Sequence, residues 1–141
     1  MVATLAIIVL LIPSTIHSDK GNATQILNPL ESLPVNPTAT QIKEAIVFTA
    51  KNNEVNADTM VALAKCESGF KDICIVDTNN KLSCGIFMFQ KATFEGFCPD
   101  LQWGDYHVAD NILCAGRMIK KGLQAYHWVN CTLKVGNAYT D

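Results

Sequence analysis

Six cysteines constrain the fold of this chain more than any other feature of its sequence. They are even in number and spread through one stretch of the chain, at Cys66, Cys74, Cys84, Cys98, Cys114 and Cys131. No two of them form a C-x-x-C pair, and this spacing argues against a structural zinc site. Three disulfides in an oxidising compartment are the simpler interpretation. The spacing leaves the connectivity open, with one expectation: Cys74 pairs with Cys84 across a hairpin.

An apolar run near the start of the sequence predicts export. The run Val2–Ile12 is apolar except for Thr4, and Pro13 follows it. It is too short to cross a bilayer as a helix, which needs about 20 residues. It fits the apolar core of a signal peptide over residues 1–18, and an uncleaved membrane anchor is the alternative. We therefore expect a protein that is secreted, periplasmic or anchored in the cell envelope.

The rest of the chain divides into a linker and one domain. Residues 19–38 hold three prolines among Asn, Ser and Thr, a composition typical of a linker. Residues 39–141 are enough for one domain, and a 49% hydrophobic content predicts a folded core. The formal net charge is -2 and the only arginine is Arg117. Nucleic acid is therefore not an expected partner.

Apolar spacing predicts two helices in the first half of this domain. The first begins near Thr40, a candidate N-cap, and ends at residues 51–53. The second begins near Asn56 or Asp58, either of which can cap it. It ends at Glu67, where a Ser-Gly pair supplies a natural stop.

The second half of the domain is predicted to hold a hairpin and three more helical segments. Residues 73–76 and 82–84 are β-compatible runs around a turn-forming segment, and they predict a small hairpin. A short helix capped by Thr93, a helix from Asp110 to Gly122 and a helical piece over 123–129 follow. The predicted fold is mostly α, in an α+β arrangement with one small β-hairpin and disulfide staples.

Glu67 is the candidate catalytic residue. It shares one helix face with Met60, Leu63 and Ala64, so the carboxyl group belongs to an apolar, inward-facing side. Partial burial disfavours the charged form, and the negative end of the helix dipole opposes it as well. Both effects raise the pKa of Glu67, as a general acid requires. The alternative is a solvated glutamate at a fraying helix end.

Several motifs in order resemble the lysozyme-like superfamily, especially its lytic transglycosylase branch. Leu63–Phe70, which contains Glu-Ser-Gly-Phe, resembles the helix that ends at the catalytic glutamate of that branch. The other matching segments are Ser83–Gln90 (Gly-Ile-x-x-x-Gln), Lys91–Phe94, Asp110–Ile112 with Ala115, and Ala125-Tyr126. The resemblance covers roughly residues 55–131. Two positions depart from the family pattern: Met88 stands where a Gln is usual, and His127 replaces an Asn.

The resemblance implies a lysozyme-like fold, with helices around a cleft, and a peptidoglycan-cleaving activity. Glu67 would be the catalytic acid, cutting the β-1,4 bond between N-acetylmuramic acid and N-acetylglucosamine without metal or cofactor. The implied substrate-binding residues are Ser68, Gly85, Met88, Gln90 and Tyr126. We expect a monomer whose partners are peptidoglycan glycan strands.

The choice between transglycosylase and hydrolase depends on a second carboxylate. A hydrolytic glycosidase usually needs two carboxyl groups. Ser83 occupies the hairpin position where animal-type lysozymes carry an Asp, and Asp77 is interpreted as a solvated turn residue. A mechanism with one acid is therefore expected. A lysozyme-type hydrolase (muramidase) and a non-catalytic glycan-binding protein of the same fold are the alternatives.

Overall fold

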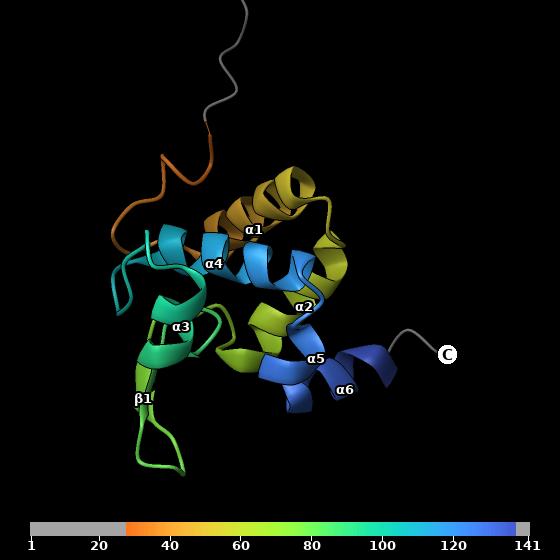
Figure 1. Ribbon diagram of the computed structural model, residues 1–141. Coiled ribbons are helices and arrows are strands. Elements are labelled where there is room, and N and C mark those ends of the chain that lie inside the picture. Colours follow the sequence, from red (N-terminus) through yellow and green to blue (C-terminus); the bar gives the residue numbers. More distant parts are fainter. Residues whose placement is uncertain (1–27, 138–141) are drawn as a thin grey trace, which may run out of the picture.

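The computed structural model describes residues 28–137 of the chain, and this part is mostly helical (Figure 1). Its helices are α1 (Ala39–Asn53), α2 (Ala57–Glu67), α3 (Lys91–Phe97), α4 (Val108–Lys120), α5 (Gln124–His127) and α6 (Val129–Asn137). Its strands are β1 (Cys74–Val76), β2 (Leu82–Cys84) and β3 (Phe89–Gln90). The predicted mostly α arrangement with a small β element is confirmed. The β1–β2 hairpin protrudes from one end of the molecule, and α5 and α6 lie on another side (Figure 1).

Capping residues determine where the two helices of the first half, α1 and α2, begin. The cap of α1 is Thr38 rather than Thr40, because Thr38 and Gln41 make a reciprocal capping box. The side chain of Asn56 caps α2, accepting a hydrogen bond of 2.8 Å from the backbone N–H of Thr59. The predicted end of α2 at Glu67 is confirmed, and Gly69 follows with φ of +64°, a left-handed value that suits glycine.

The sheet has three strands, one more than the predicted hairpin. In the antiparallel β1–β2 pair, Cys74 lies opposite Cys84, and the predicted disulfide between them is present. The chain then turns tightly, with the Met88 N–H bonded to the Gly85 carbonyl, and β3 adds to the other side of β2. A strand of two residues is too short to show a period in the sequence, so the hairpin prediction misses it.

The later helices differ from the prediction at their ends. Helix α3 begins at Lys91, so Thr93 lies inside it, and α4 begins at Val108, before Asp110. The single piece predicted over 123–129 is wrong, because α5 ends before Trp128 and α6 follows. Trp128 leaves the helical conformation, and its indole turns inward, donating a 2.9 Å hydrogen bond to the Phe87 carbonyl.

One hydrophobic core joins these elements. Helix α1 packs against both α2 and α4, and the core extends to the aromatic rings of Phe87, Phe89, Phe94 and Trp128. Two further disulfides, Cys66–Cys131 and Cys98–Cys114, complete the set of three, so the six cysteines are all paired. Three disulfides indicate folding in an oxidising environment.

Part of the predicted linker packs onto the domain. Leu30 and Leu33 are half-buried against the core, and the Asn28 side chain accepts a 3.1 Å hydrogen bond from the Leu30 N–H. The structured region therefore begins before residue 39. The predicted signal peptide or anchor at residues 1–18 lies outside the described residues. Within 28–137, no helix combines the length and apolar character that a bilayer crossing requires.

Candidate active site

A cavity of about 310 Å³ lies where the end of α2, the sheet and α5 meet. We call it the cleft. It is lined by Glu67, Asp77, Ser83, Met88, Phe89, Gln90, Thr93, Tyr126, His127 and Trp128. It therefore brings together four of the residues that the sequence predicts to act on substrate: Glu67, Met88, Gln90 and Tyr126. Asp77, for which the sequence suggests a solvated position, lines the cleft with them.

Glu67 enters the cleft from the last turn of α2. The face that it shares with Met60, Leu63 and Ala64 is buried, with all three of those residues fully enclosed. Burial of the carboxyl group raises the pKa of Glu67 above its ordinary value of 4.5, and the negative charge of Asp77 raises it further. The positive charge of Lys134 on α6 opposes these two effects. Glu67 thus combines access to a cavity with a pKa raised above that of an ordinary glutamate.

Asp77 is held in the cleft by the sheet. Side chains alternate between the two faces of a strand, so Ile75 and Asp77 point to one side of the hairpin. Ser83 and Gln90 are directly opposite each other on β2 and β3 and share that side. The Asp77 carboxylate accepts a hydrogen bond from the Ser83 hydroxyl and another, of 3.0 Å, from Gln90 Nε2. Asp77 does begin the predicted turn, as its carbonyl accepts a 2.9 Å hydrogen bond from the Asn80 N–H, but its half-buried, hydrogen-bonded carboxylate is not the solvated group that the sequence suggests.

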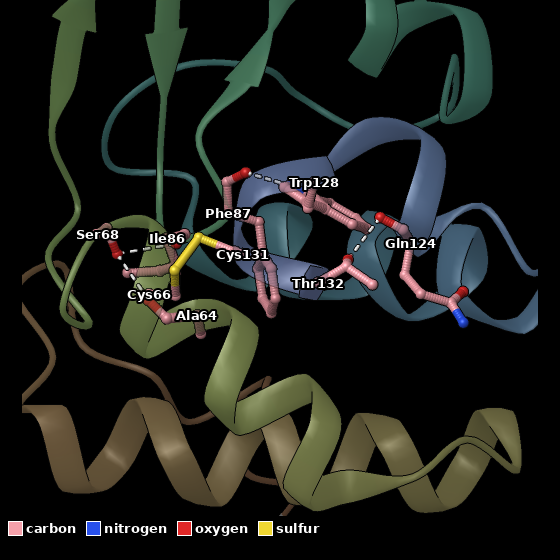
Figure 2. Close-up of a disulfide and its surroundings, with 9 residues drawn as sticks. All are labelled: Ala64, Cys66, Ser68, Ile86, Phe87, Gln124, Trp128, Cys131 and Thr132. Atoms are coloured by element: carbon pink, nitrogen blue, oxygen red, sulfur yellow. Dashed lines mark hydrogen bonds between the residues drawn. A yellow bond between two sulfur atoms is a disulfide. The ribbon is translucent and has the colours of Figure 1, made fainter. Parts of the chain in front are cut away.

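Ser68 and Gly85 do not line the cleft. The Ser68 hydroxyl donates a 2.8 Å hydrogen bond to the Ile86 carbonyl, so it ties the end of α2 to the turn between β2 and β3 (Figure 2). Gly85 is buried with φ of +82°, and a Cβ there would lie 2.1 Å from Asn111 Nδ2. The absence of a side chain at Gly85 is thus required by a close protein contact.

Asn111 is the buried polar residue that shapes this turn. Its Oδ1 accepts a 2.8 Å hydrogen bond from the Phe87 N–H, and its Nδ2 donates a 3.2 Å bond to the Cys84 carbonyl. A buried amide with both ends satisfied fixes the backbone that it contacts. Asn111 therefore positions the segment that leads into Met88 and Gln90. In the sequence, Asn111 stands out only as part of the Asn-Ile pair that resembles the family motif, and that pair by itself does not predict this structural role.

Three aromatic residues line the cleft from α5 and the position after it: Tyr126, His127 and Trp128. Tyr126 is 78% exposed, and its ring lies nearly perpendicular to that of His127. His127 also contacts Phe97 and Trp128 edge-on, and burial lowers its pKa, which favours the neutral imidazole. The sequence suggests a structural role for His127 and does not reveal its position in the cleft wall.

A disulfide connects the two sides of this site. Cys66, directly before Glu67, is bonded to Cys131 on α6 across a sequence separation of 65 residues (Figure 2). Next to it, the Thr132 hydroxyl donates a 2.9 Å hydrogen bond to the Gln124 carbonyl and so joins α6 to α5 (Figure 2). The position of α5 and its cleft residues relative to Glu67 is therefore covalently restrained.

No family model, no curated protein and no solved structure matches the chain. The side chains of the cleft are therefore the guide to its chemistry. Over the described range 28–137, no three His, Cys, Asp or Glu side chains are grouped as a metal site would need. The cleft itself offers a carboxyl group whose pKa is raised by burial, a hydrogen-bonded second carboxyl group, an amide and aromatic side chains. These are groups suited to acid–base chemistry on a polar ligand.

Proposed function

We propose that this protein is a peptidoglycan-cleaving glycosidase of the lytic transglycosylase type, with Glu67 as its catalytic acid. The observation that carries the proposal is the half-buried Glu67 carboxyl group, whose pKa is raised by burial, facing a cavity of about 310 Å³. The ordered motifs that resemble the lysozyme-like superfamily support the choice of substrate. Three disulfides fit the secreted, periplasmic or envelope location that such a substrate demands.

The proposed reaction uses the substrate's own groups. Glu67 gives its proton to the glycosidic oxygen, and the bond from that oxygen to the anomeric carbon of N-acetylmuramic acid breaks. The N-acetyl oxygen attacks the anomeric carbon and stabilises its positive charge. The Glu67 carboxylate then removes the proton of the sugar 6-hydroxyl, whose oxygen bonds to the anomeric carbon and displaces the acetamido oxygen. The 1,6-anhydro product forms, and Glu67 is protonated again.

Hydrolysis is a second candidate, which the position of Asp77 favours. A hydrolytic glycosidase usually has two carboxyl groups in one active-site cavity. Asp77 lines the cleft with Glu67 and raises the pKa of that residue through its charge. In this version Asp77 would stabilise the cationic transition state or activate a water molecule.

Digestion of purified peptidoglycan, followed by mass spectrometry of the released fragments, separates the candidates. Anhydro-muropeptides are expected for the transglycosylase. Reducing ends would instead identify the hydrolase. Binding to peptidoglycan without release of fragments would contradict both and indicate the non-catalytic glycan-binding alternative.

A further inference from the structure

A second cavity adjoins the cleft at Gln90. It has a volume of about 340 Å³, and we call it the side pocket. Its lining residues are Lys81, Leu82, Gln90, Lys91, Ala92 and Trp103. Gln90 lines both cavities, so the side pocket and the cleft adjoin at this residue.

The side pocket combines apolar surface with two positive charges. Leu82, Ala92 and the indole of Trp103 supply the apolar surface. Lys91 Nζ lies 6.0 Å from the centroid of the Trp103 ring, and Lys81 is exposed at the same pocket. Lys91 Nζ also lies 3.7 Å from a Glu95 oxygen, with both side chains more than half exposed. An exposed pair of this kind is weak, so the ammonium group remains available to another anion.

Several contacts anchor the loop that carries Trp103. The Trp103 indole donates a 2.8 Å hydrogen bond to the Phe89 carbonyl, which fixes the ring beside β3. Four other contacts anchor residues 98–106. One is the disulfide Cys98–Cys114, and another is the ion pair in which Arg117 donates hydrogen bonds of 2.7 and 2.9 Å to Asp100. The other two are hydrogen bonds from backbone N–H groups to carboxylates, from Gln102 to Asp110 (3.1 Å) and from Tyr106 to Asp72 (2.6 Å). A ring held in this way presents its apolar face to a ligand with little further loss of conformational freedom.

We propose that the side pocket binds the carboxylate-bearing peptide stem of the peptidoglycan strand whose sugar occupies the cleft. The inference rests on the proposed function. In peptidoglycan the stem is joined to N-acetylmuramic acid itself, next to the bond to be cut, so its place is beside the cleft. A short peptide with methyl groups and carboxylates matches an apolar pocket flanked by Lys81 and Lys91. The enzyme would thereby favour glycan strands that retain their stems.

The test compares two substrates and two matched double variants. Lys81→Gln/Lys91→Gln removes the two charges of the side pocket. Lys43→Gln/Lys121→Gln removes the same charge from two lysines that also lie over aromatic rings, at 4.9 and 5.9 Å, but outside both cavities. The substrates are soluble glycan strands with their stems and the same strands after an amidase has removed the stems.

For the side-pocket variant we expect KM on stem-bearing strands to rise about five- to tenfold, the scale of two partly exposed charge pairs. KM on stripped strands and kcat on both substrates should stay unchanged, as should all values for the control variant. An equal rise on both substrates, or in both variants, would show general attraction of charge and overturn the proposal. No rise would overturn it too.

A binding measurement separates this proposal from the proposed function. Equilibrium binding of the two kinds of strand is measured in a Glu67→Gln background, with and without the side-pocket substitutions. Binding that depends on the stems and on Lys81 and Lys91 supports the side pocket even if the wild-type protein cleaves nothing. Binding that ignores the stems contradicts it even if the protein cleaves peptidoglycan.

Discussion

At the scale of single residues, the chemistry of the cleft depends on how two carboxyl groups are held. Glu67 reaches the cavity from a buried helix face, and Asp77 reaches it from a strand end where Ser83 and Gln90 hold its carboxylate. Burial and the charge of Asp77 both raise the pKa of Glu67. The two carboxyl groups therefore differ: the pKa of Glu67 is raised, whereas the Asp77 carboxylate accepts two hydrogen bonds.

Replacing the proposed acid should abolish most of the activity. We expect Glu67→Gln to lower kcat on peptidoglycan by about 10²-fold or more, the usual contribution of a positioned acid. The amide keeps the size of the side chain, so the circular dichroism spectrum should match that of the wild type. Glu44→Gln, on the exposed side of α1, is the matched control and should retain full activity. Near-full activity of Glu67→Gln would overturn the site assignment.

Two charges should move the pH profile in opposite directions. In the proposed mechanism Glu67 acts in its protonated form, so activity should be lost as pH rises through the pKa of Glu67. Asp77 raises that pKa and Lys134 lowers it. We expect Asp77→Asn to shift the alkaline limb of kcat/KM to lower pH and Lys134→Gln to shift it to higher pH. Shifts of the same sign would contradict the assignment of this limb to Glu67.

The same Asp77→Asn variant distinguishes the two mechanisms. A transglycosylase that needs only Glu67 should keep its turnover at the new optimal pH to within about tenfold. A hydrolase that uses Asp77 as its second carboxyl group should lose about 10²-fold or more. The product analysis by mass spectrometry must agree with whichever result is found.

At the scale of elements, the turn between β2 and β3 links the sheet to α4. Gly85 and Asn111 are in contact there, and the amide of Asn111 bonds the backbone on both sides of the glycine. This turn leads into Met88 and Gln90, which line the cleft. The contact is between segments far apart in the sequence.

A methyl group at Gly85 should damage this turn. It would meet Asn111 Nδ2 at 2.1 Å, and the φ of +82° is unfavourable for alanine. We expect Gly85→Ala to lower the free energy of unfolding in urea by about 2–3 kcal/mol. Gly96→Ala in α3, where a Cβ meets open space, should be neutral or stabilising by up to about 1 kcal/mol.

A double-mutant cycle locates the cause of the damage. If the Asn111 contact is responsible, Gly85→Ala should cost clearly less in an Asn111→Ala background than in the wild type. Equal costs in the two backgrounds would place the loss in backbone strain alone.

The sequence predicts elements well where the signal is local. The cap at Asn56, the end of α2 and the Cys74–Cys84 bridge all follow from residues close in sequence, and the structure confirms them. For Asp77 the turn formers next to it predict the turn correctly, but the orientation of its carboxylate depends on contacts with β2 and β3 that they do not reveal. The short strand β3 and the break between α5 and α6 at Trp128 likewise depend on tertiary contacts. The spacing of apolar residues along the sequence does not reveal such contacts.

At the scale of the whole molecule, the disulfides differ in the length of chain that they bridge. Cys66–Cys131 spans 65 residues and joins α2 to α6, while Cys74–Cys84 spans 10 residues within one hairpin. Loop-closure entropy makes the longer link worth about 4 kcal/mol and the shorter about 3 kcal/mol. We expect the two disulfides to differ more in their effect on activity than in their effect on stability. Of the two, only Cys66–Cys131 joins the helix that carries Glu67 to the helix that follows α5.

Removing each of these disulfides separately tests that difference. We expect Cys66→Ala/Cys131→Ala to lower the free energy of unfolding by about 4 kcal/mol. We also expect it to lower kcat/KM under conditions where the protein is still folded, because α6, and α5 with it, would no longer be linked covalently to the residue next to Glu67. Cys74→Ala/Cys84→Ala should destabilise by a similar or smaller amount, with kcat/KM changed less in the folded protein. Melting by circular dichroism and assays well below Tm separate the two effects. If the hairpin variant lost activity while the α2–α6 variant kept it, the sheet rather than the α2–α6 disulfide would set the geometry of the cleft.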